Sequence, residues 1–243
     1  MDNPRRTKIV ATIGPATESA EMLDKVIQAG VDVFRVNFSH GSPEAHMERA
    51  RLIRERAAKA GRHIGILADL QGPKIRIERF VNDSVMLKQG ASFVLDASLD
   101  RDAGDESGVG LTYKALPRDV NAGDVLLLDD GMIVLTVDDV EGDKINCVVT
   151  GGGKLSNNKG VNRHGGGLSA DALTEKDKQD IKVAASINAD FLAVSFVRCA
   201  SDVEEARRLL QEAGGHAWIV SKIERAEAID DIEDITRASD VLM

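Results

Sequence analysis

The sequence predicts an α/β fold in which repeated strand–helix units are interrupted by an inserted domain of short strands. Apolar runs typical of strands alternate with segments that carry a helical apolar stripe, both before residue 77 and after residue 170. Between these positions the helical period fades, and turn residues separate short β-type runs. Repeated strand–helix units form a parallel sheet, which is either closed as a barrel or doubly wound.

Two helices and three strands are expected in the first 76 residues. The first helix is expected over 18–29, since Gly30 can end it. The second opens with Ser42-Pro43-Glu44, which combines a cap residue, a first-turn proline and an acidic first turn, and ends at Gly61. The strands are expected at Lys8–Ile13, 31–38 and Ile64–Ala68.

The same order returns after the inserted segment. Thr174 and Asp177 have the spacing of a capping box ahead of one helix, and Ser201 and Glu204 have similar spacing ahead of another. A further helix is expected over 225–237. The strands of this part are expected at Phe191–Phe196, Trp218–Ile223 and Val241–Met243.

The inserted segment is expected to be all-β, and it divides the chain into 1–76, 77–170 and 171–243. Five strand–helix units and the start of a sixth strand can be counted outside it. A complete eight-stranded barrel takes about 250 residues. The remainder is therefore an open sheet or an incomplete (β/α)8 TIM barrel. The polar and charged residues at the carboxyl ends of its strands, described below, favour the barrel. The insertion's strands are expected at Val85–Leu87, Phe93–Leu95, Val125–Leu128, Ile133–Val137 and Ile145–Val149.

Composition excludes several classes of function. The chain is 43% hydrophobic, carries a net charge of −9 and has no basic block, so nucleic acid is not an expected partner. No apolar run approaches the length of a membrane span and no secretory leader is evident, so the cytoplasm is the expected location. Cys147 and Cys199 lie far apart and form no CxxC motif, which disfavours a disulfide framework or a structural zinc site.

The segment RVNFSHG at 35–41 is the most informative candidate site, because an apolar strand changes abruptly there into polar residues. Side chains two apart share one face of a strand, so Arg35, Asn37 and Ser39 are expected to point together. One cation beside two oxygen-bearing side chains suits an anion with a metal beside it. The alternative is an ordinary polar strand end that leads into a turn, and His40 can likewise be a turn residue.

Two further strand ends carry charged side chains. Asp69 precedes Lys74 and Arg76, and Lys222 lies two positions before Glu224. In α/β barrels the active site lies at the carboxyl ends of the strands, where all these groups fall. Converging cations and carboxylates suit a phosphorylated substrate with a divalent metal. The alternatives are a turn cap for Asp69 and a solvated ion pair for Lys222 and Glu224.

Ordered motifs along the whole chain resemble those of pyruvate kinase, in its bacterial branch. The resemblance implies a TIM barrel with an inserted lid, and the conversion of phosphoenolpyruvate and ADP to pyruvate and ATP in glycolysis. The motifs are TKIVATIGPAT (7–17), RVNFSHG (35–41), ADLQGPKIR (68–76), LLLDDG (126–131), NNKGVN (157–162), LTEKDKQDI (173–181), AVSFVR (193–198) and SKIERAEA (221–228).

The resemblance implies a role for each matching residue. Arg35 would contact the transferring phosphoryl group, and Lys222 would lie at the phosphate and the developing enolate oxygen. Ser195 and Phe196 would line the floor of the substrate pocket. Glu224 would ligate Mg²⁺ (or Mn²⁺). A monovalent-cation site would be formed by Asn37, Ser39, Asp69 and the carbonyl of Leu70.

The nucleotide, ADP or ATP, would be held by Arg76 and by Lys159 of the lid, with Asn37 and His40 nearby. Lys74 stands where many family members have a glutamate. Its ammonium group could replace the potassium ion, so independence of K⁺ is expected.

Family members continue past Met243 with a second metal ligand, the rest of the barrel and a C-terminal domain. These 243 residues alone are therefore expected to be inactive, and the full-length protein to be a homotetramer. Two alternatives remain: another metal-dependent barrel enzyme that acts on phosphoenolpyruvate or oxoacids, and a non-catalytic phosphate-binding fragment.

Overall fold

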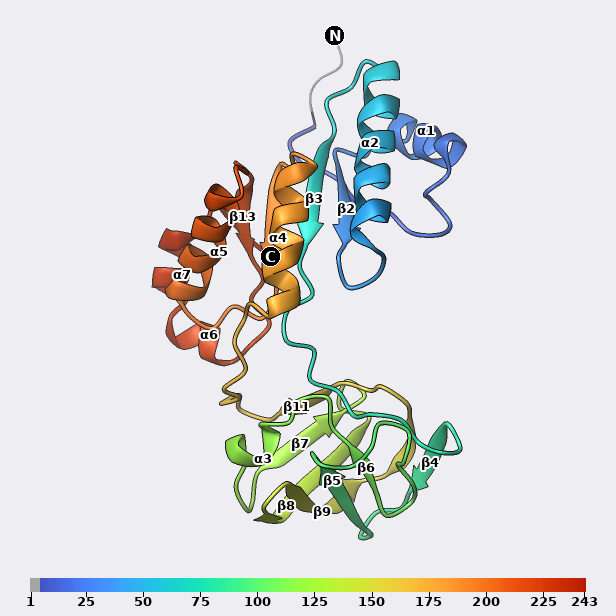
Figure 1. Ribbon diagram of the computed structural model, residues 1–243, viewed down its shortest axis with the longest axis vertical. Coiled ribbons are helices and arrows are strands. Elements are labelled where there is room, and N and C mark those ends of the chain that lie inside the picture. The colour runs from blue at the N-terminus through green and yellow to red at the C-terminus, as the bar shows by residue number, and fades with distance from the viewer. Residues whose placement is uncertain (1–4) are drawn as a thin grey trace. The chain divides into compact units, whose positions relative to one another are not determined.

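The computed structural model describes residues 5–243 and divides the chain into two compact units. The first unit consists of the chain up to Pro73 together with Ala172–Met243, and the second is Lys74–Asp171 (Figure 1). The sequence places these boundaries at 76/77 and 170/171. Each unit has its own hydrophobic core, with Phe34 and Ile66 at the centre of one and Phe93 and Leu135 at the centre of the other.

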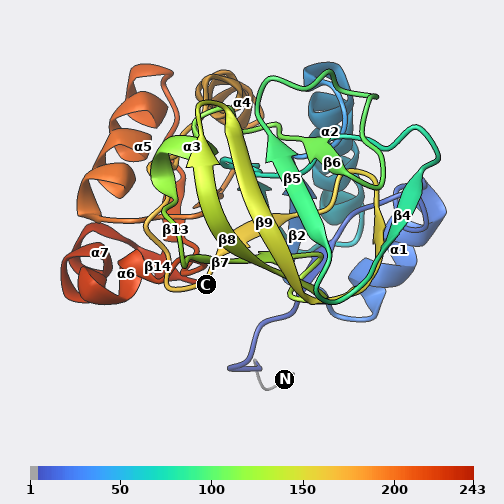
Figure 2. The same ribbon diagram turned by 90° about the horizontal axis from the view of Figure 1, so that it is seen from below.

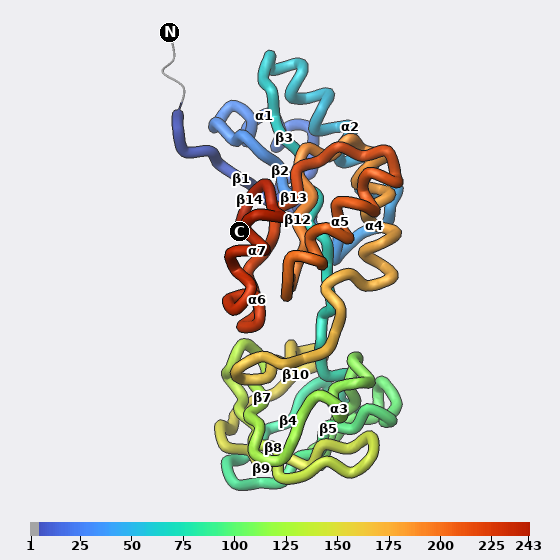
Figure 3. Tube along the Cα trace, turned by 90° about the vertical axis from the view of Figure 1, so that its left-hand side faces the viewer, coloured from blue at the N-terminus to red at the C-terminus, as the bar shows by residue number. Residues whose placement is uncertain are grey.

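The first unit is built on a six-stranded parallel sheet in the order β1-β2-β3-β12-β13-β14. Parallel neighbours need a crossover, and each crossover here contains a helix, so the expected strand–helix repeat is confirmed. The chain can be followed through these strands in Figure 3. They are β1 Val10–Thr12, β2 Val33–Asn37, β3 Gly65–Asp69, β12 Phe191–Val194, β13 Trp218–Ser221 and β14 Val241–Leu242.

Side-chain caps begin three helices of this unit, since Ser19, Ser42 and Thr174 each accept a backbone N–H of the first turn. The expected capping box of Thr174 and Asp177 is confirmed. No helix among residues 5–243 is long and apolar enough to cross a membrane. The helices are α1 Ala20–Gln28, α2 Pro43–Lys59, α4 Glu175–Ser186, α5 Ala200–Glu212, α6 Glu227–Asp230 and α7 Ile232–Ala238.

Two helix expectations are wrong, and one carboxylate is involved in both. The helix expected over 225–237 is two helices, which are interrupted at Asp231. Ala200 is the first residue of α5, and its backbone N–H donates to the Asp231 carboxylate at 2.8 Å. α5 therefore begins before Ser201, and its N-cap Cys199 makes no side-chain cap. A long-range acceptor has replaced the local cap that the sequence suggested.

An aspartate directly before a strand ties that strand to its neighbour at three places in the sheet. Each aspartate accepts the backbone N–H of an isoleucine that lies in the neighbouring strand of the sheet or directly before that strand. Each aspartate also pairs with an arginine. This arrangement satisfies donors at the amino ends of the strands. The bonds are Ile9 to Asp32 at 2.8 Å, Ile66 to Asp190 at 2.6 Å and Ile219 to Asp240 at 2.8 Å.

The second unit is mostly β-structure. One sheet has the order β11-β7-β8-β9-β5-β6, with β5, β8 and β9 visible side by side in Figure 2, and a second sheet pairs β10 with β4. The helix α3 (Leu116–Asp119), with a proline in its first turn, departs from the all-β expectation. The strands are β4 Ser84–Leu87, β5 Ser92–Asp96, β6 Gly108–Gly110, β7 Val125–Leu128, β8 Ile133–Glu141, β9 Lys144–Gly151, β10 Gly153–Ser156 and β11 Val161–Arg163.

Candidate functional site

The carboxyl ends of β2, β3, β12 and β13 bring the candidate residues of the first unit to one edge of the parallel sheet. Asn37 is in register with Asp69, and Asp69 with Ala193. The residue Val194 is in register with Ser221, the last residue of β13. Because parallel strands end at the same edge, residues that directly follow β12 and β13 lie beside the end of β3.

Asp69 occupies the centre of this cluster, with its side chain only 3% exposed. Arg35 Nε donates to Asp69 Oδ2 at 2.7 Å, and a second guanidinium nitrogen pairs with the same oxygen. Lys222 Nζ lies 3.4 Å from Asp69 Oδ1. Within residues 5–243, Oδ1 has no hydrogen-bond partner although it is buried. The carboxylate therefore pairs with two cations, with Arg35 through Oδ2 and with Lys222 through Oδ1.

Lys222 joins the carboxylates to a short hydrogen-bonded relay. Its Nζ donates to Ser195 Oγ at 2.8 Å and lies 3.1 Å from Glu224 Oε1. Ser195 Oγ in turn donates to the carbonyl of Leu70 at 2.8 Å. The lysine side chain is 14% exposed, so its position is set by these partners. An ammonium group held in this way can meet an anion without first reorganising.

Glu224 is oriented by the backbone of Phe196. The Phe196 N–H donates to Glu224 Oε2 at 3.1 Å. Phe196 has φ +57, which is the left-handed region that a bulky residue rarely adopts. A strained backbone at a cluster of charges is a frequent feature of functional sites.

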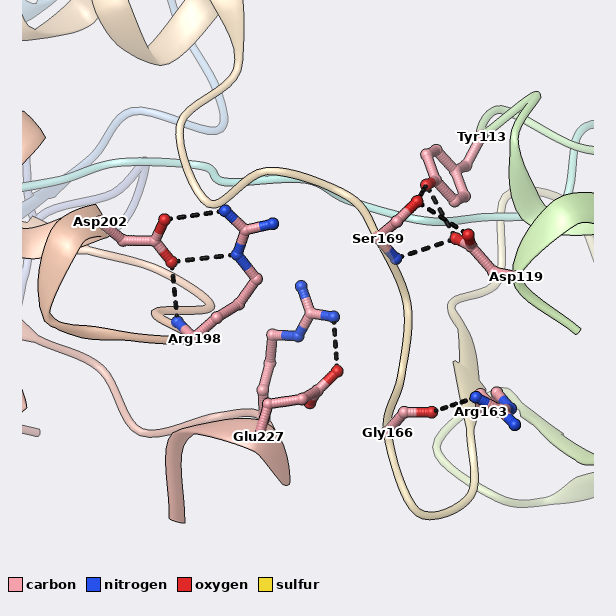
Figure 4. A network of polar contacts seen from close by, with 9 residues as sticks. Tyr113, Asp119, Arg163, Gly166, Ser169, Arg198, Asp202 and Glu227 are labelled. Carbon is pink, nitrogen blue, oxygen red and sulfur yellow. Dashed lines mark hydrogen bonds and ion pairs between the residues drawn. The ribbon is translucent and has the colours of Figure 1, made fainter. Parts of the chain in front are cut away.

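Two arginines form ion pairs in the segments that follow Phe196 and Glu224, and the pair of Arg198 with Asp202 is drawn in Figure 4. Arg198, two positions after Phe196, donates to Asp202 at 2.8 Å, and Arg225, next to Glu224, donates to Glu227 at 2.8 Å. Both arginine side chains are mostly buried, with 25% and 8% exposure. These ion pairs lie directly beside the loops that carry the candidate site.

The loop after β2 has its own supports. Asn37 Oδ1 accepts the N–H of Ser39 at 3.0 Å, which forms a tight turn. The carbonyl of Phe38 accepts from Lys176 Nζ at 2.7 Å, and the Phe38 ring stacks on His46 with 4.1 Å between centroids. The amide oxygen of Asn37 is thus already engaged in the turn. His40, which follows Ser39, is exposed.

Arg76 and Lys159 lie close together within the second unit. Arg76 forms an antiparallel bridge with Gly160, the residue after Lys159. Lys159 Nζ lies 2.8 Å from Asp129 Oδ1, and Asp129 has φ +51. Two cations on adjacent segments can bind a polyphosphate together. Lys74 is the first residue of this unit.

The oxygen donors of the first unit fit a cation. Asp69 Oδ1 is buried without a hydrogen bond, and the Leu70 carbonyl and the Glu224 carboxylate belong to the same cluster. Residues 5–243 contain no group of three histidine, cysteine, aspartate or glutamate side chains that could hold a metal. Mg²⁺ commonly needs only one or two carboxylates when substrate phosphates complete its shell, so the donor set is compatible with it.

Three residues that support the site were not predicted from the sequence as site residues. Thr12 Oγ1 accepts from Arg35 at 3.1 Å, Lys176 holds the Phe38 carbonyl, and Asp177 holds the N–H of Gly72. The position of Thr12 near the end of the first strand was a usable signal. The contacts of Lys176 and Asp177 span more than 100 residues of sequence, and no local pattern announces them.

Comparison with known proteins agrees with this geometry. The family profile "Pyruvate kinase, barrel domain" matches residues 4–243. Pyruvate kinase II of Salmonella typhimurium is 58% identical over 242 residues, which cover 98% of this chain and 50% of that protein. A pyruvate kinase of Buchnera aphidicola is 54% identical over 246 residues, or 100% of this chain and 51% of that protein. The chain thus spans about half the length of the curated relatives it matches.

Proposed function

Since this chain belongs to the pyruvate kinase family, we propose that the complete protein transfers a phosphoryl group from phosphoenolpyruvate to ADP, giving pyruvate and ATP in glycolysis. The observation that carries the proposal is the cluster of Arg35, Asp69, Lys222 and Glu224 at one sheet edge. Phosphoryl transfer depends on positioning and charge neutralisation more than on covalent chemistry, and this cluster supplies both.

Each residue of the cluster has a distinct proposed task. Arg35 binds the transferring phosphoryl group, and its contacts with Thr12 and Asp69 hold the guanidinium in place. Lys222 lies at the phosphate and stabilises the negative charge that develops on the enolate oxygen. Ser195 and Phe196 form the floor of the pocket. Asp69 is shared between both cations, and Glu224 also pairs with Lys222.

Two cations are proposed for the site. Glu224 would hold Mg²⁺ (or Mn²⁺), which when bound neutralises charge on the phosphate oxygens. Asn37, Ser39, Asp69 and the carbonyl of Leu70 would form a monovalent-cation site. Asp69 Oδ1, which is buried and accepts no hydrogen bond among residues 5–243, supports it.

Lys74 raises the hypothesis that the complete enzyme does not need K⁺, because its ammonium group would replace the ion. Turnover measured with K⁺ exchanged for tetramethylammonium is expected to change little. A loss of about tenfold or more, roughly 1.4 kcal/mol, would refute the hypothesis.

The second unit is proposed to be a lid over an incomplete (β/α)8 TIM barrel, and to hold the nucleotide through Arg76 and Lys159, with Asn37 and His40 of the first unit nearby. Closure of such a lid would exclude water and limit hydrolysis of the transferring group. We expect ADP to protect residues 74–171 from limited proteolysis. Lack of protection would favour the rival reading of a carbon–carbon lyase that acts on phosphoenolpyruvate or oxoacids.

The decisive experiment compares Glu224→Gln with Glu212→Gln in the complete protein. Glu212 is an exposed glutamate paired with Arg208 on α5, so it is a matched control for charge removal. Pyruvate formation is expected to fall by about 10²-fold or more in Glu224→Gln and to stay unchanged in the control. If turnover survives in Glu224→Gln, Glu224 has no essential role. If the unmodified protein itself forms no pyruvate, a non-catalytic phosphate-binding role becomes the better description.

Assembly and location complete the proposal. The full-length protein is proposed to be a cytoplasmic homotetramer, and the 243 residues alone to be inactive. Measurable pyruvate formation by this polypeptide would contradict the last statement.

A further inference from the structure

Asp177 makes more contacts than a helix cap requires. The residue lies in the first turn of α4 with no exposed surface. Its Oδ2 accepts from the backbone N–H of Thr174 at 2.9 Å and from Thr174 Oγ1 at 2.5 Å, which completes the capping box. Its other oxygen, Oδ1, accepts the N–H of Gly72 at 3.1 Å, a residue 105 positions away in the chain.

These two sets of bonds fall at the two points where the chain crosses between the units. The chain leaves the first unit after Pro73, one residue beyond Gly72, and returns to it at Ala172, two residues before Thr174. One buried carboxylate therefore holds both the outgoing and the returning segment on the first-unit side.

The position of Gly72 is also linked to the candidate site. Gly72 has φ +65, and a Cβ atom there would lie 2.8 Å from Phe196 Cδ2 and 3.3 Å from the Ser195 carbonyl. Two residues earlier, the carbonyl of Leu70 accepts from Ser195 Oγ, which accepts from Lys222 Nζ. The segment 70–72 is thus packed directly against the groups that hold Lys222, and no side chain fits at Gly72.

The same return segment is held on the side of the second unit by a different carboxylate. Ser169 donates to Asp119 through its N–H at 3.0 Å and through its Oγ at 2.8 Å, and Tyr113 donates to the same aspartate (Figure 4). Each unit therefore has its own anchor near the crossing.

We propose that Asp177 is a positioning residue that anchors both crossing segments and, through Gly72, holds Leu70 and Ser195 where they orient Lys222. The predicted effect on catalysis rests on the proposed kinase function. The anchoring role of Asp177 rests only on its hydrogen bonds to Gly72 and Thr174. A carboxylate that served only as a helix cap would affect the stability of α4 without affecting the Lys222 relay.

The test compares Asp177→Ala with Thr174→Ala in the complete protein. Thr174→Ala removes the side-chain cap of the same helix but leaves the bond from Gly72 to Asp177 intact, so it is a matched control for helix stability. Two quantities are measured well below both melting temperatures: kcat for pyruvate formation, and hydrogen exchange of the amides in 70–72 and 193–198. If Asp177→Ala does not fold, Asp177→Asn is measured in its place, because its single amide oxygen can accept from Gly72 or from the Thr174 N–H but not from both.

We expect Asp177→Ala to lower kcat by at least about tenfold and to accelerate exchange in both segments, as misplaced site groups do. Thr174→Ala is expected to lower the melting temperature with neither effect. Equal losses of kcat in the two variants, or unchanged exchange in Asp177→Ala, would overturn the inference. If the unmodified protein has no kinase activity, the proposed function fails separately, and exchange in the two segments still decides whether Asp177 is the anchor.

Discussion

At the scale of single residues, the candidate site is a balance of two cations against two carboxylates. Asp69 is buried between Arg35 and Lys222, and Glu224 adds a second, more exposed carboxylate with 34% side-chain exposure. Groups this close influence one another, so the effect of changing one depends on the others.

Asp69→Asn is predicted to lower both stability and turnover. The amide cannot neutralise Arg35 and Lys222, and hydrogen bonds to charged groups contribute about 1.5–3 kcal/mol each. A urea titration of the 243-residue chain is expected to show a loss of about that size. Glu55→Gln, which removes an exposed partner of Arg51, should change stability by less than about 0.5 kcal/mol. Equal midpoints for the two variants would contradict the prediction.

His46 is predicted to make stability depend on pH. Burial, with the nearby charges of Arg49 and Lys176, lowers its pKa from 6.5 to about 4. The unfolded chain then takes up a proton as pH falls below 6.5, whereas the folded chain does so only near pH 4. Stability from this group is therefore fully present above pH 6.5 and is lost as pH falls toward 4, by at most roughly 3 kcal/mol.

The check is the free energy of unfolding of the chain between pH 7 and 4. His46→Phe retains an aromatic ring against Phe38 but cannot titrate, so its stability should fall less steeply than that of the unmodified protein. His63→Gln changes an exposed histidine and should leave the slope as it was. If His46→Phe and the unmodified protein have the same slope, the assignment to His46 is wrong.

At the scale of elements, some helices begin at a local cap and others at a contact with a distant residue. The capping box of α4 was predictable because Thr174 and Asp177 are three residues apart. The start of α5 was not, because the acceptor for Ala200 is Asp231, 31 residues later. Elements with a local cap are therefore the ones whose boundaries a sequence can predict.

Asp190→Ala is predicted to destabilise the first unit by about 1–3 kcal/mol, because the N–H of Ile66 and the guanidinium of Arg54 lose their shared acceptor. Chemical denaturation of the chain measures this directly. Asp230→Ala, an exposed aspartate at the end of α6, is the control and should have an effect within about 0.5 kcal/mol. A negligible effect of Asp190→Ala would show that this aspartate is not a structural link between β3 and β12.

At the scale of the whole molecule, the two units differ in how the chain builds them. The second unit has a continuous core that includes Phe93, Leu111, Leu126 and Leu135. The first unit is assembled from two separate stretches of the chain, whereas the second is one continuous stretch, Lys74–Asp171. A continuous stretch with its own core is the better candidate for independent folding.

The fragment of residues 74–171 is therefore predicted to fold alone. It should unfold in a single cooperative transition, since all of its core residues come from within the fragment. Circular dichroism on heating is the measurement. The same fragment with Leu135→Asp, which places a carboxylate at a fully buried position, should lose the transition. A fragment without any cooperative transition would contradict the prediction.

The sequence by itself determined the strand–helix order, the location of the inserted β-rich segment, the family, and the strand ends on which charged residues lie. These features are local, because side-chain periodicity, turn residues and short motifs are written in consecutive positions. Only the tertiary structure decided that Asp69 is shared by Arg35 and Lys222, that Phe196 orients Glu224, and that Asp177 holds Gly72. Such contacts join residues far apart in the chain, and they form only when the folded sheet and its helices bring these segments together.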